Sequence, residues 1–289
     1  MNNYVAYIDT DSIFIMINAF LKAQGIDIAK WDALDKNTKI KYILKLAKEI
    51  EKQVNKRSYE ETQVIDYNSS VEFDDFSIKL KQEIICAESI FFAPKMYAYH
   101  VINEEGNDVD DISAKGIEII KSTAPSAFKA PLKDILKMLL MGVPDSEIKK
   151  KIFEYRTKFY DTDPDEMSVH IGVNNIDKYI KDGMPIKGTP GHVCGVAYYH
   201  KLLKELNIEN IYEPVREGDK CKFVYLKNNK YRFPSITYHV YPKEFINNGI
   251  LPCYDTMIEK YFLNKIALLL KPIDKEYIID ENSAFDIFF

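Results

Sequence analysis

The sequence has few cysteines and only one tryptophan. Its four cysteines, Cys86, Cys194, Cys221 and Cys253, are widely separated, and no two of them form a Cys-x-x-Cys pair. Neither a disulfide framework nor a zinc knuckle is therefore indicated, and a reducing compartment such as the cytoplasm is favoured. The five histidines form no metal-ligand spacing either, and we interpret His192 and Cys194 as chance neighbours.

Long apolar runs are also absent. The longest nearly apolar stretch, from Ile13 to Leu21, contains Asn18 and is far shorter than the roughly 20 residues that span a bilayer. No basic segment followed by an apolar run opens the chain, so we expect no secretory signal and no membrane partner. We find no internal repeat. With 46% hydrophobic and 29% charged residues, the composition is that of a globular protein and disfavours disorder, collagen and coiled coil.

The charge is unevenly distributed along the chain. The 289 residues suggest about two domains, and the net charge of -5 conceals regions of opposite sign. Residues 1–112 carry a net charge of -7, residues 113–204 of +4, residues 205–271 of +2, and residues 272–289 of -4. The middle of the chain is therefore basic, while both ends are acidic.

Two apolar segments near the start, 4–8 and 13–17, have the aromatic and β-branched composition of buried strands. They flank the polar link Asp9-Thr10-Asp11-Ser12, which predicts a hairpin with Asp9 and Asp11 at its tip. A tight turn lets two such carboxylates converge. Short carboxylates are hard oxygen donors that suit Mg²⁺, although the same pattern is also typical of a solvated turn in which aspartates only cap backbone groups.

The rest of the chain changes from strand-rich to helix-rich near residue 125. Apolar periodicity predicts strands within 71–102, at 112–120 and at 220–225, an acidic turn at 103–111, and helices at 38–57, 132–140, 148–159, 195–206 and 254–270. Gly142 is placed to end one helix, and Pro144 to open the next. We therefore expect an α+β fold, with an antiparallel sheet over 1–124, a mostly helical domain over 125–273 and a peptide tail over 274–289.

Two further segments carry basic residues beside aromatic or glycine residues. Lys95 and Tyr97 are two apart in an expected strand, which would place them on one face, where they could hold a phosphate and a sugar. The alternative is an edge lysine beside a core tyrosine. In Lys115-Gly116-Ile117-Glu118, the glycine would permit close approach of another backbone, although a strand that simply ends in a turn has the same pattern.

In this order and spacing, the three segments resemble the C-terminal half of a family B DNA polymerase, especially of the T-even-like bacteriophage type. Asp9-Thr10-Asp11-Ser12 matches that family's Tyr-Gly-Asp-Thr-Asp-Ser palm motif, with Ile8 in place of glycine. The segment 94–97 is similar to its Lys-Lys-x-Tyr motif, with proline in place of the first lysine. The segment 115–118 resembles the Lys-x-Gly-x-Glu-type stretch that leads from palm to thumb, and Glu83 resembles an acidic residue behind the metal site.

The remaining resemblance lies in the second half of the chain. The segments 173–179, 192–199 and 216–220 are similar to parts of the thumb. The last residues resemble a clamp-binding peptide that would insert Phe285, Ile287, Phe288 and Phe289 into a sliding clamp, because aromatic side chains make good anchors in a partner's pocket. The alternative for this segment is docking on the chain's own thumb.

The resemblance implies a DNA-directed DNA polymerase that transfers nucleotides with two Mg²⁺ ions. Asp11 would be the direct metal ligand, with support from Asp9 and, behind them, Glu83. Lys95, Tyr97 and Lys115 would hold primer–template DNA near the bound dNTP. Residues 1–124 would then be the end of the palm, 125–273 the thumb and 274–289 the clamp-binding tail.

Two motifs of such a polymerase are missing from the sequence: an earlier palm motif, Asp-x-x-Ser-Leu-Tyr-Pro, and a fingers motif, Lys-x-x-x-Asn-Ser-x-Tyr-Gly. We therefore expect an N-terminal partner chain carrying the exonuclease, the first palm motif and the fingers, or truncation of a larger protein. In either case the chain alone should not synthesise DNA. Its expected location is the cytoplasm, that of an infected bacterium if the protein is viral.

Two other functions share parts of this pattern. A non-catalytic DNA-binding or clamp-tethering protein derived from a polymerase would keep the thumb and tail, but it would not need Asp9 and Asp11, and both are present. A sugar-nucleotide glycosyltransferase also uses an Asp-x-Asp motif. That enzyme requires a doubly wound nucleotide domain before the motif, for which the sequence has no room.

Overall fold

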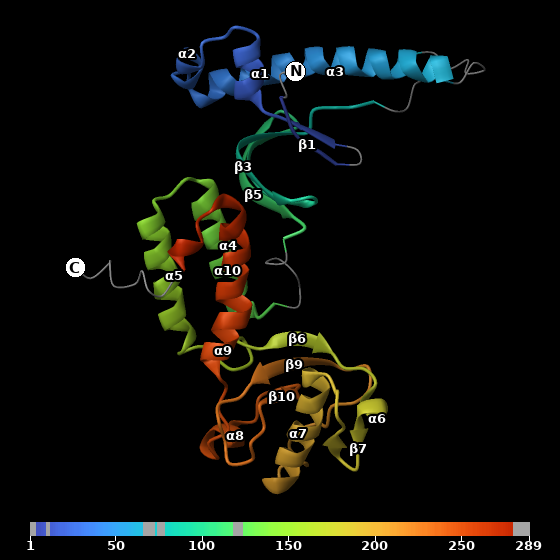
Figure 1. Ribbon diagram of the computed structural model, residues 1–289, viewed down its shortest axis with the longest axis vertical. Helices are drawn as coiled ribbons and strands as arrows, with labels where there is room; N and C mark the ends of the chain where they lie inside the picture. Colours follow the sequence, from blue (N-terminus) through green and yellow to red (C-terminus); the bar gives the residue numbers. More distant parts are fainter. Residues whose placement is uncertain (1–3, 10–11, 66–72, 74–78, 118–123, 280–289) are drawn as a thin grey trace. The chain divides into compact units, whose positions relative to one another are not determined.

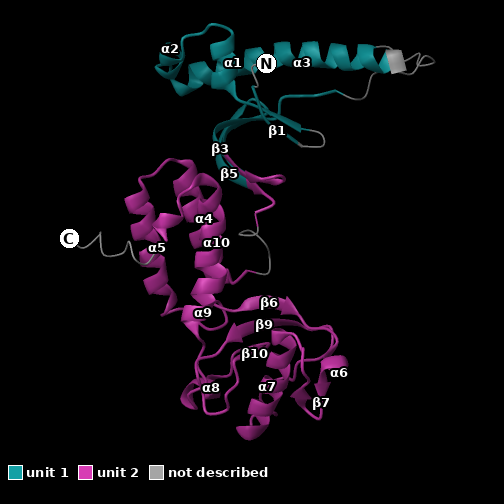
Figure 2. Cartoon of the chain, viewed as in Figure 1, with its two compact units in different colours: residues 1–89, 98–113 teal, residues 90–97, 114–289 magenta. Residues whose placement is uncertain are grey.

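Helices and antiparallel strands alternate along the chain, so the predicted α+β class is confirmed. The computed structural model describes residues 4–9, 12–65, 73, 79–117 and 124–279 (Figure 1). Internal contacts divide the chain into two compact units, shown in Figure 2: unit 1 comprises residues 1–89 and 98–113, and unit 2 comprises residues 90–97 and 114–289. The domain boundaries expected at 124 and 273 stay predictions. None of the described helices is both long and apolar enough to cross a bilayer.

Unit 1 begins with the hairpin of β1 (Val5–Asp9) and β2 (Ser12–Ile15). Three helices follow it: α1 (Ile17–Ala23), α2 (Ile28–Asp32) and α3 (Lys36–Ile65). Asp27 accepts a hydrogen bond from the N–H of Ala29 at the start of α2, and Asp35 accepts bonds from the N–H and hydroxyl of Thr38 at the start of α3. The helix predicted over 38–57 is confirmed and is longer than expected.

A three-stranded sheet follows, with strand order β3-β4-β5. Its strands are β3 (Ile84–Ala93), β4 (Met96–Glu104) and β5 (Asn107–Lys115). The acidic turn predicted at 103–111 is wrong in extent, because only Glu105 and Gly106 form the turn and β5 begins at Asn107. The acidic residues of β5 are mostly exposed, since they lie on the edge strand of the sheet.

The helical part of unit 2 is built from α4 (Ser126–Leu140), α5 (Asp145–Phe159), α9 (Tyr254–Ile258), a π-helical turn (Glu259–Leu263) and α10 (Asn264–Leu270). The rings of Phe128, Phe159 and Phe262 meet at its centre, with centroids 4.7 to 5.7 Å apart. Gly142, with φ +64°, ends α4, and Pro144 precedes α5, as predicted.

The second part of unit 2 is a small sheet covered by a helix, with strand order β10-β9-β6. Its elements are β6 (Val169–Gly172), β9 (Lys220–Tyr225), β10 (Ser235–Tyr238) and α7 (Gly191–Glu205). At Gly195 of α7 a Cβ would lie 2.6 Å from the Thr237 hydroxyl, so the glycine lets the helix approach β10 closely. Only the β9 strand was predicted, and the expectation of a mostly helical second domain omitted β6 and β10.

Short elements complete unit 2. They are α6 (Ile176–Tyr179), the strand pair β7 (Ile180–Lys181) and β8 (Met184–Pro185), α8 (Lys243–Asn247), and 3₁₀ turns at Lys271–Ile273 and Glu276–Ile278. Ile278 is buried, and Lys275 forms an ion pair with Asp145 of α5 at 2.7 Å. Residues 274–279 of the expected extended tail therefore dock on the chain itself, while 280–289, including Phe285, Ile287, Phe288 and Phe289, lie outside the described residues.

Candidate active site and nucleic-acid interface

The Asp-Thr-Asp-Ser segment joins two paired strands. β1 and β2 are antiparallel, with Asp9 opposite Ser12, so the predicted hairpin is confirmed. Thr10, Asp11 and the side chain of Asp9 lie outside the described residues. Carboxylates on a two-residue connection form the donor set that hard cations prefer, so the residue types fit Mg²⁺. The convergence of the carboxylates on a metal stays a prediction.

One face of this hairpin is apolar and uncovered. Ile8 lies opposite Ile13, and these side chains are 64% and 46% exposed. On the other face, the Phe14 ring packs at a centroid distance of 5.8 Å from Tyr99 of β4. The two strands are therefore half-buried within this chain, whereas their composition predicted buried strands. The exposed isoleucine pair is a candidate contact for a partner, although it is smaller than the contiguous patches that mark such surfaces.

Glu83 is exposed and immediately precedes β3, where its carbonyl accepts a hydrogen bond from the N–H of Glu105 at 2.7 Å. Glu105 in turn pairs with Lys81 at 2.8 Å. The hydrogen bond that Lys81 donates to the Glu105 carboxylate raises the pKa of Lys81, and the charges of Glu83 and Glu51 act in the same direction. Glu83 thus belongs to a group of carboxylates around a lysine, and its predicted role behind the metal site stays a prediction.

Lys95 lies in the turn between β3 and β4, not within a strand. Its φ is +62°, and it follows Pro94, which is the order of residues that a type II turn requires. A non-glycine residue at positive φ is strained, and such strain is common at functional sites. The expectation that Lys95 and Tyr97 share one strand face is wrong, because the turn projects Lys95 into solvent.

Tyr97 is fully buried, with its ring 5.7 Å from that of Phe91. The alternative considered from the sequence, a core tyrosine beside an edge lysine, describes this arrangement. Because the Tyr97 ring is buried in the chain's own core, next to the turn that carries Lys95, it does not reach a ligand in this conformation. Its assignment to DNA binding stays a prediction that would require a different conformation.

Gly116 brings the second and third sequence motifs into contact. It follows Lys115, the exposed last residue of β5, and has φ +70°. A Cβ at Gly116 would lie 1.8 Å from the carbonyl oxygen of Lys95 and 3.2 Å from the Cα of Met96. The predicted close approach of another backbone is therefore confirmed, and it sets Lys95 and Lys115 at the same end of the sheet.

The three segments assigned to the thumb also meet in space (Figure 1). The N–H of Val173 donates to the carbonyl of Asp219 at 2.9 Å, and the N–H of Gly218 donates back to Val173 at 2.8 Å. The Glu217 carboxylate accepts from the N–H groups at the start of α6. The Thr189 hydroxyl donates to the Tyr179 carbonyl just before α7. Segments that the sequence alone showed only as separate matches are thus one connected structure.

A basic and aromatic loop, residues 227–233, lies between β9 and β10 (the 227–233 loop). Asn229 organises it: its amide donates to the carbonyls of Lys227 and Phe233 at 2.9 and 2.8 Å, and its oxygen accepts from the N–H groups of Tyr231 and Phe233. The Phe233 ring stacks on Tyr198 of α7 at 4.4 Å. The sequence analysis missed this loop, although its alternation of basic and aromatic residues was the available signal.

Cations surround this stack. Lys201 lies over the Phe233 ring at 5.8 Å, and Lys230 over the Tyr231 ring at 5.0 Å. Arg232 between them is exposed and has φ +58°. Phe233 is buried, whereas Tyr198 and Tyr231 are half-buried, and partly exposed aromatic rings beside exposed cations are a composition that suits nucleic-acid backbones and bases.

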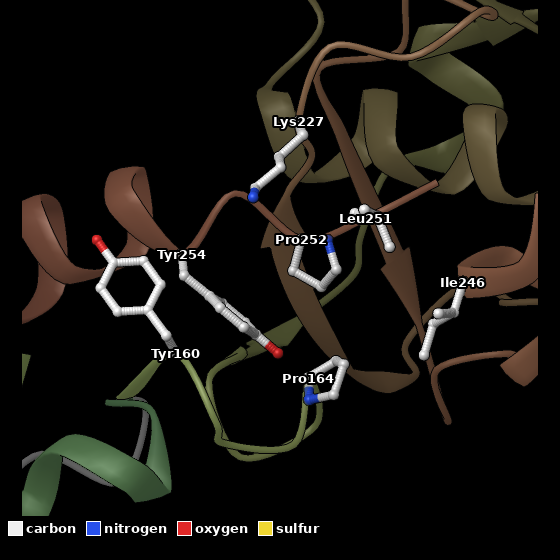
Figure 3. A pocket seen from close by; sticks show the side chains of 7 residues that line it. All are labelled: Tyr160, Pro164, Lys227, Ile246, Leu251, Pro252 and Tyr254. Carbon is white, nitrogen blue, oxygen red and sulfur yellow. The ribbon is translucent and has the colours of Figure 1, made fainter. Parts of the chain in front are cut away.

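A pocket of about 290 Å³ lies beside the same loop (Figure 3). Its lining residues are Tyr160, Pro164, Lys227, Ile246, Leu251, Pro252 and Tyr254. The Tyr254 hydroxyl donates to the Thr162 carbonyl, and the Tyr160 hydroxyl bonds to Asp255. The lining includes no carboxylate, histidine or cysteine, and its ionisable groups are the Lys227 amine and the phenols of Tyr160 and Tyr254.

No protein-family model matches the chain, and no curated protein is significantly similar to it. The family is therefore not established by comparison. The resemblance rests on the quoted motifs, and the function drawn from it is a proposal.

Proposed function

We propose that this chain is the C-terminal part of a DNA-directed DNA polymerase of the family B type, which acts together with an N-terminal chain or segment. The observation that carries the proposal is the hairpin: an Asp-Thr-Asp-Ser sequence joins two paired strands, with Asp9 opposite Ser12. The contact between Gly116 and the backbone of Lys95 adds support, because it unites two motifs that the resemblance places next to the primer.

The exposed face of the hairpin supports an N-terminal partner. Ile8 and Ile13 form a cross-strand apolar pair that is open to solvent beside the proposed metal ligands. An isoleucine side chain that passes from full exposure to full burial contributes about 1.5–3 kcal/mol to association. The segment with the first palm motif would cover this face and bring the remaining carboxylates to the metal site.

Within such a complex, Asp11 with support from Asp9 would hold Mg²⁺. The metal would supply Lewis-acid chemistry, which lowers the pKa of the primer 3′-hydroxyl and neutralises the dNTP phosphates. Glu83 would act behind these ligands. Lys95 and Lys115, both exposed at one end of the sheet, would bind primer phosphates, and the buried Tyr97 would keep the turn that carries Lys95 in place.

Unit 2 would grip the duplex through phosphates, largely without reading sequence. The 227–233 loop and α7 offer exposed cations next to stacked aromatic rings, which suits both phosphates and bases. The C-terminal residues 285–289 would tether the complex to a sliding clamp, and the complex would work in the cytoplasm.

The proposed DNA interface is tested by replacing Lys201, Lys230 and Arg232 together with alanine. Each phosphate contact contributes about 0.9 to the slope of log affinity against log salt. We therefore expect the triple variant to bind primer–template duplex more weakly and with a slope smaller by about 2 to 3. Fluorescence anisotropy of a labelled duplex at several salt concentrations measures both quantities.

The control replaces three exposed lysines of α3 (Lys41, Lys45 and Lys48) with alanine, which removes the same charge from unit 1. Its salt slope should stay within experimental error of the wild-type slope. If the salt slope falls by the same amount in both triple variants, the attraction to DNA depends on net charge only, and the 227–233 loop is not the DNA interface.

A further inference from the structure

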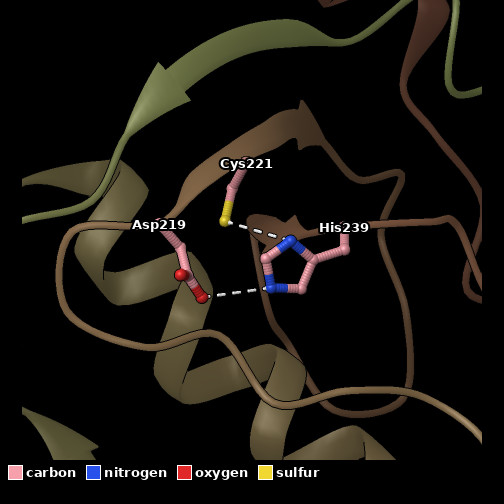
Figure 4. A group of neighbouring side chains, drawn as sticks. All are labelled: Asp219, Cys221 and His239. Atoms are coloured by element: carbon pink, nitrogen blue, oxygen red, sulfur yellow. Dashed lines mark hydrogen bonds and ion pairs between the residues drawn. The ribbon is translucent and has the colours of Figure 1, made fainter.

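A thiol, an imidazole and a carboxylate meet at the start of β9 (Figure 4). The Sγ of Cys221 lies 3.8 Å from Nδ1 of His239, and Nε2 of the same ring lies 3.2 Å from Oδ2 of Asp219. Strand pairing brings these residues together. Tyr238 of β10 is opposite Lys222 of β9. Because the strands are antiparallel, His239, which follows Tyr238, lies next to Cys221, which precedes Lys222. None of these groups takes part in the polymerase site proposed above.

The imidazole is held in one orientation. Oδ2 of Asp219 accepts the N–H of Arg216 at 2.7 Å, and Val173 brackets the turn through hydrogen bonds to the backbone of Gly218 and Asp219. The carboxylate lies 3.2 Å from Nε2 of His239, and this pairing favours the tautomer with the proton on Nε2, in which the Nδ1 lone pair faces the thiol. A histidine that ligates a metal through one nitrogen typically donates its other N–H to a carboxylate in this way.

We propose that Cys221 and His239 form a binding site for Zn²⁺, with the thiolate and Nδ1 as ligands and Asp219 as the residue that positions the ring. Zinc bonds of about 2.3 Å to sulfur and 2.0–2.1 Å to nitrogen, at a tetrahedral angle, separate the two donors by about 3.6 Å. The observed 3.8 Å is close to that separation. Sulfur and imidazole nitrogen select zinc over Mg²⁺, so this site differs in chemistry from the Asp-Thr-Asp-Ser hairpin.

The thiol of the pair is buried, and the imidazole and the carboxylate beside it are partly exposed. Cys221 is 3% exposed, whereas the side chains of His239 and Asp219 are 29% and 33% exposed and line the approach. Burial, with the nearby charge of Asp219, raises the pKa of Cys221 to about 11, which is unlike an activated nucleophile. On binding, the S–H bond breaks, the proton passes to solvent and a Zn–S bond forms.

The remaining coordination positions are open to water or an external ligand. Glu217, the nearest other carboxylate in sequence, accepts the N–H groups of Asn175 and Ile176 at 2.6 and 2.8 Å and is therefore engaged. Zinc sites that keep open positions are typical of reactive or regulatory metals, whereas closed four-residue sites are structural.

Cobalt titration of the full chain tests this site. Chelator-treated protein is titrated with Co²⁺, and thiolate-to-cobalt charge-transfer absorption is recorded in the near ultraviolet. We expect one Co²⁺ per chain, displaced by Zn²⁺ but not by Mg²⁺. The C221S variant should lose this absorption, whereas the C194S variant, which removes a half-buried thiol of α7, should keep it. Absence of the absorption, or its persistence in C221S, overturns the proposal.

A second measurement distinguishes loss of the zinc site from failure of a variant to fold. The far-ultraviolet circular dichroism of C221S should match that of the wild type. Zn²⁺ should raise the thermal unfolding midpoint of the wild type and of C194S, but not of C221S or H239Q. D219N should bind zinc about 10- to 100-fold more weakly, the usual effect of losing an outer partner of a ligating histidine. Unchanged affinity in D219N would contradict the positioning role. These outcomes do not depend on the polymerase assignment.

Discussion

Replacing Asp11 with alanine is expected to reduce nucleotide incorporation by the reconstituted polymerase by at least about 10³-fold. A metal ion contributes several kcal/mol to stabilising the transition state of phosphoryl transfer, and about 4 kcal/mol corresponds to that factor. Affinity for primer–template duplex should be nearly unchanged, because the proposed duplex contacts lie in unit 2. Single-nucleotide primer extension measures the first quantity, and fluorescence anisotropy of the labelled duplex measures the second.

The matched control is Thr10→Ala in the same connection, which alters the turn without removing a carboxylate. Its incorporation rate should stay within about tenfold of the wild type, the loss expected from a small positional effect of about 1.4 kcal/mol. If Asp11→Ala retains full activity, Asp11 is not a metal ligand. If Thr10→Ala is as inactive as Asp11→Ala, the loss reflects a damaged hairpin.

Replacing Gly116 with alanine is expected to destabilise the fold by at least about 3 kcal/mol. The left-handed conformation costs a non-glycine residue about 1–2 kcal/mol. The added Cβ would also lie 1.8 Å from the Lys95 carbonyl, a distance that forces the turn between β3 and β4 to move. Urea unfolding followed by circular dichroism measures the change, and primer binding through Lys95 should weaken with it.

Gly106→Ala separates the two contributions. Gly106 lies in the turn between β4 and β5 with φ +91°, and a Cβ there would have no heavy atom within 4 Å. This variant should therefore show only the conformational cost of about 1–2 kcal/mol. Equal destabilisation by the two substitutions would contradict the close approach of Gly116 to Lys95.

The periodicity of apolar residues predicted the helices and strands that bury one face. The stripes of α4 and α5 are buried as expected; Leu132 and Ile148 are both fully buried, for example. The β1–β2 hairpin followed from two apolar segments around a short polar link. In the hairpin the paired residues are close in the sequence, and in α4 and α5 the apolar stripe repeats within one helix, so a short window contains the information even though the stripes pack against the distant Phe262.

The missed strand residues lack the composition or alternation by which a strand is detected in the sequence. β5 contains Asp108, Asp110 and Asp111, and its pairing with β4 outweighs the low strand preference of aspartate. β10 is buried along its whole length, including Ser235 and Thr237, so it lacks the alternation typical of a half-buried strand. A search for period-two patterns passes over β10 and over the first residues of β5, of which only 112–115 fall in the predicted strand at 112–120.

The candidate sites also include features that were predictable from the sequence and features that were not. Close approach at Gly116 was predictable because glycine has a specific physical use, whereas the position of Lys95 depended on a two-residue turn that the sequence did not reveal. Cys221 and His239 became neighbours only through the pairing of β9 with β10. Their separation in the sequence matches no metal-ligand spacing, and the sequence analysis passed over them for that reason.

The most direct test of the proposed function is primer extension by the purified chain, alone and mixed with a chain that carries the first palm motif and the fingers. The account predicts no incorporation by either chain alone and Mg²⁺-dependent incorporation by the mixture, abolished by Asp11→Ala. A folded mixture that binds primer–template duplex but incorporates no nucleotide would contradict the polymerase assignment and favour a non-catalytic DNA-binding protein.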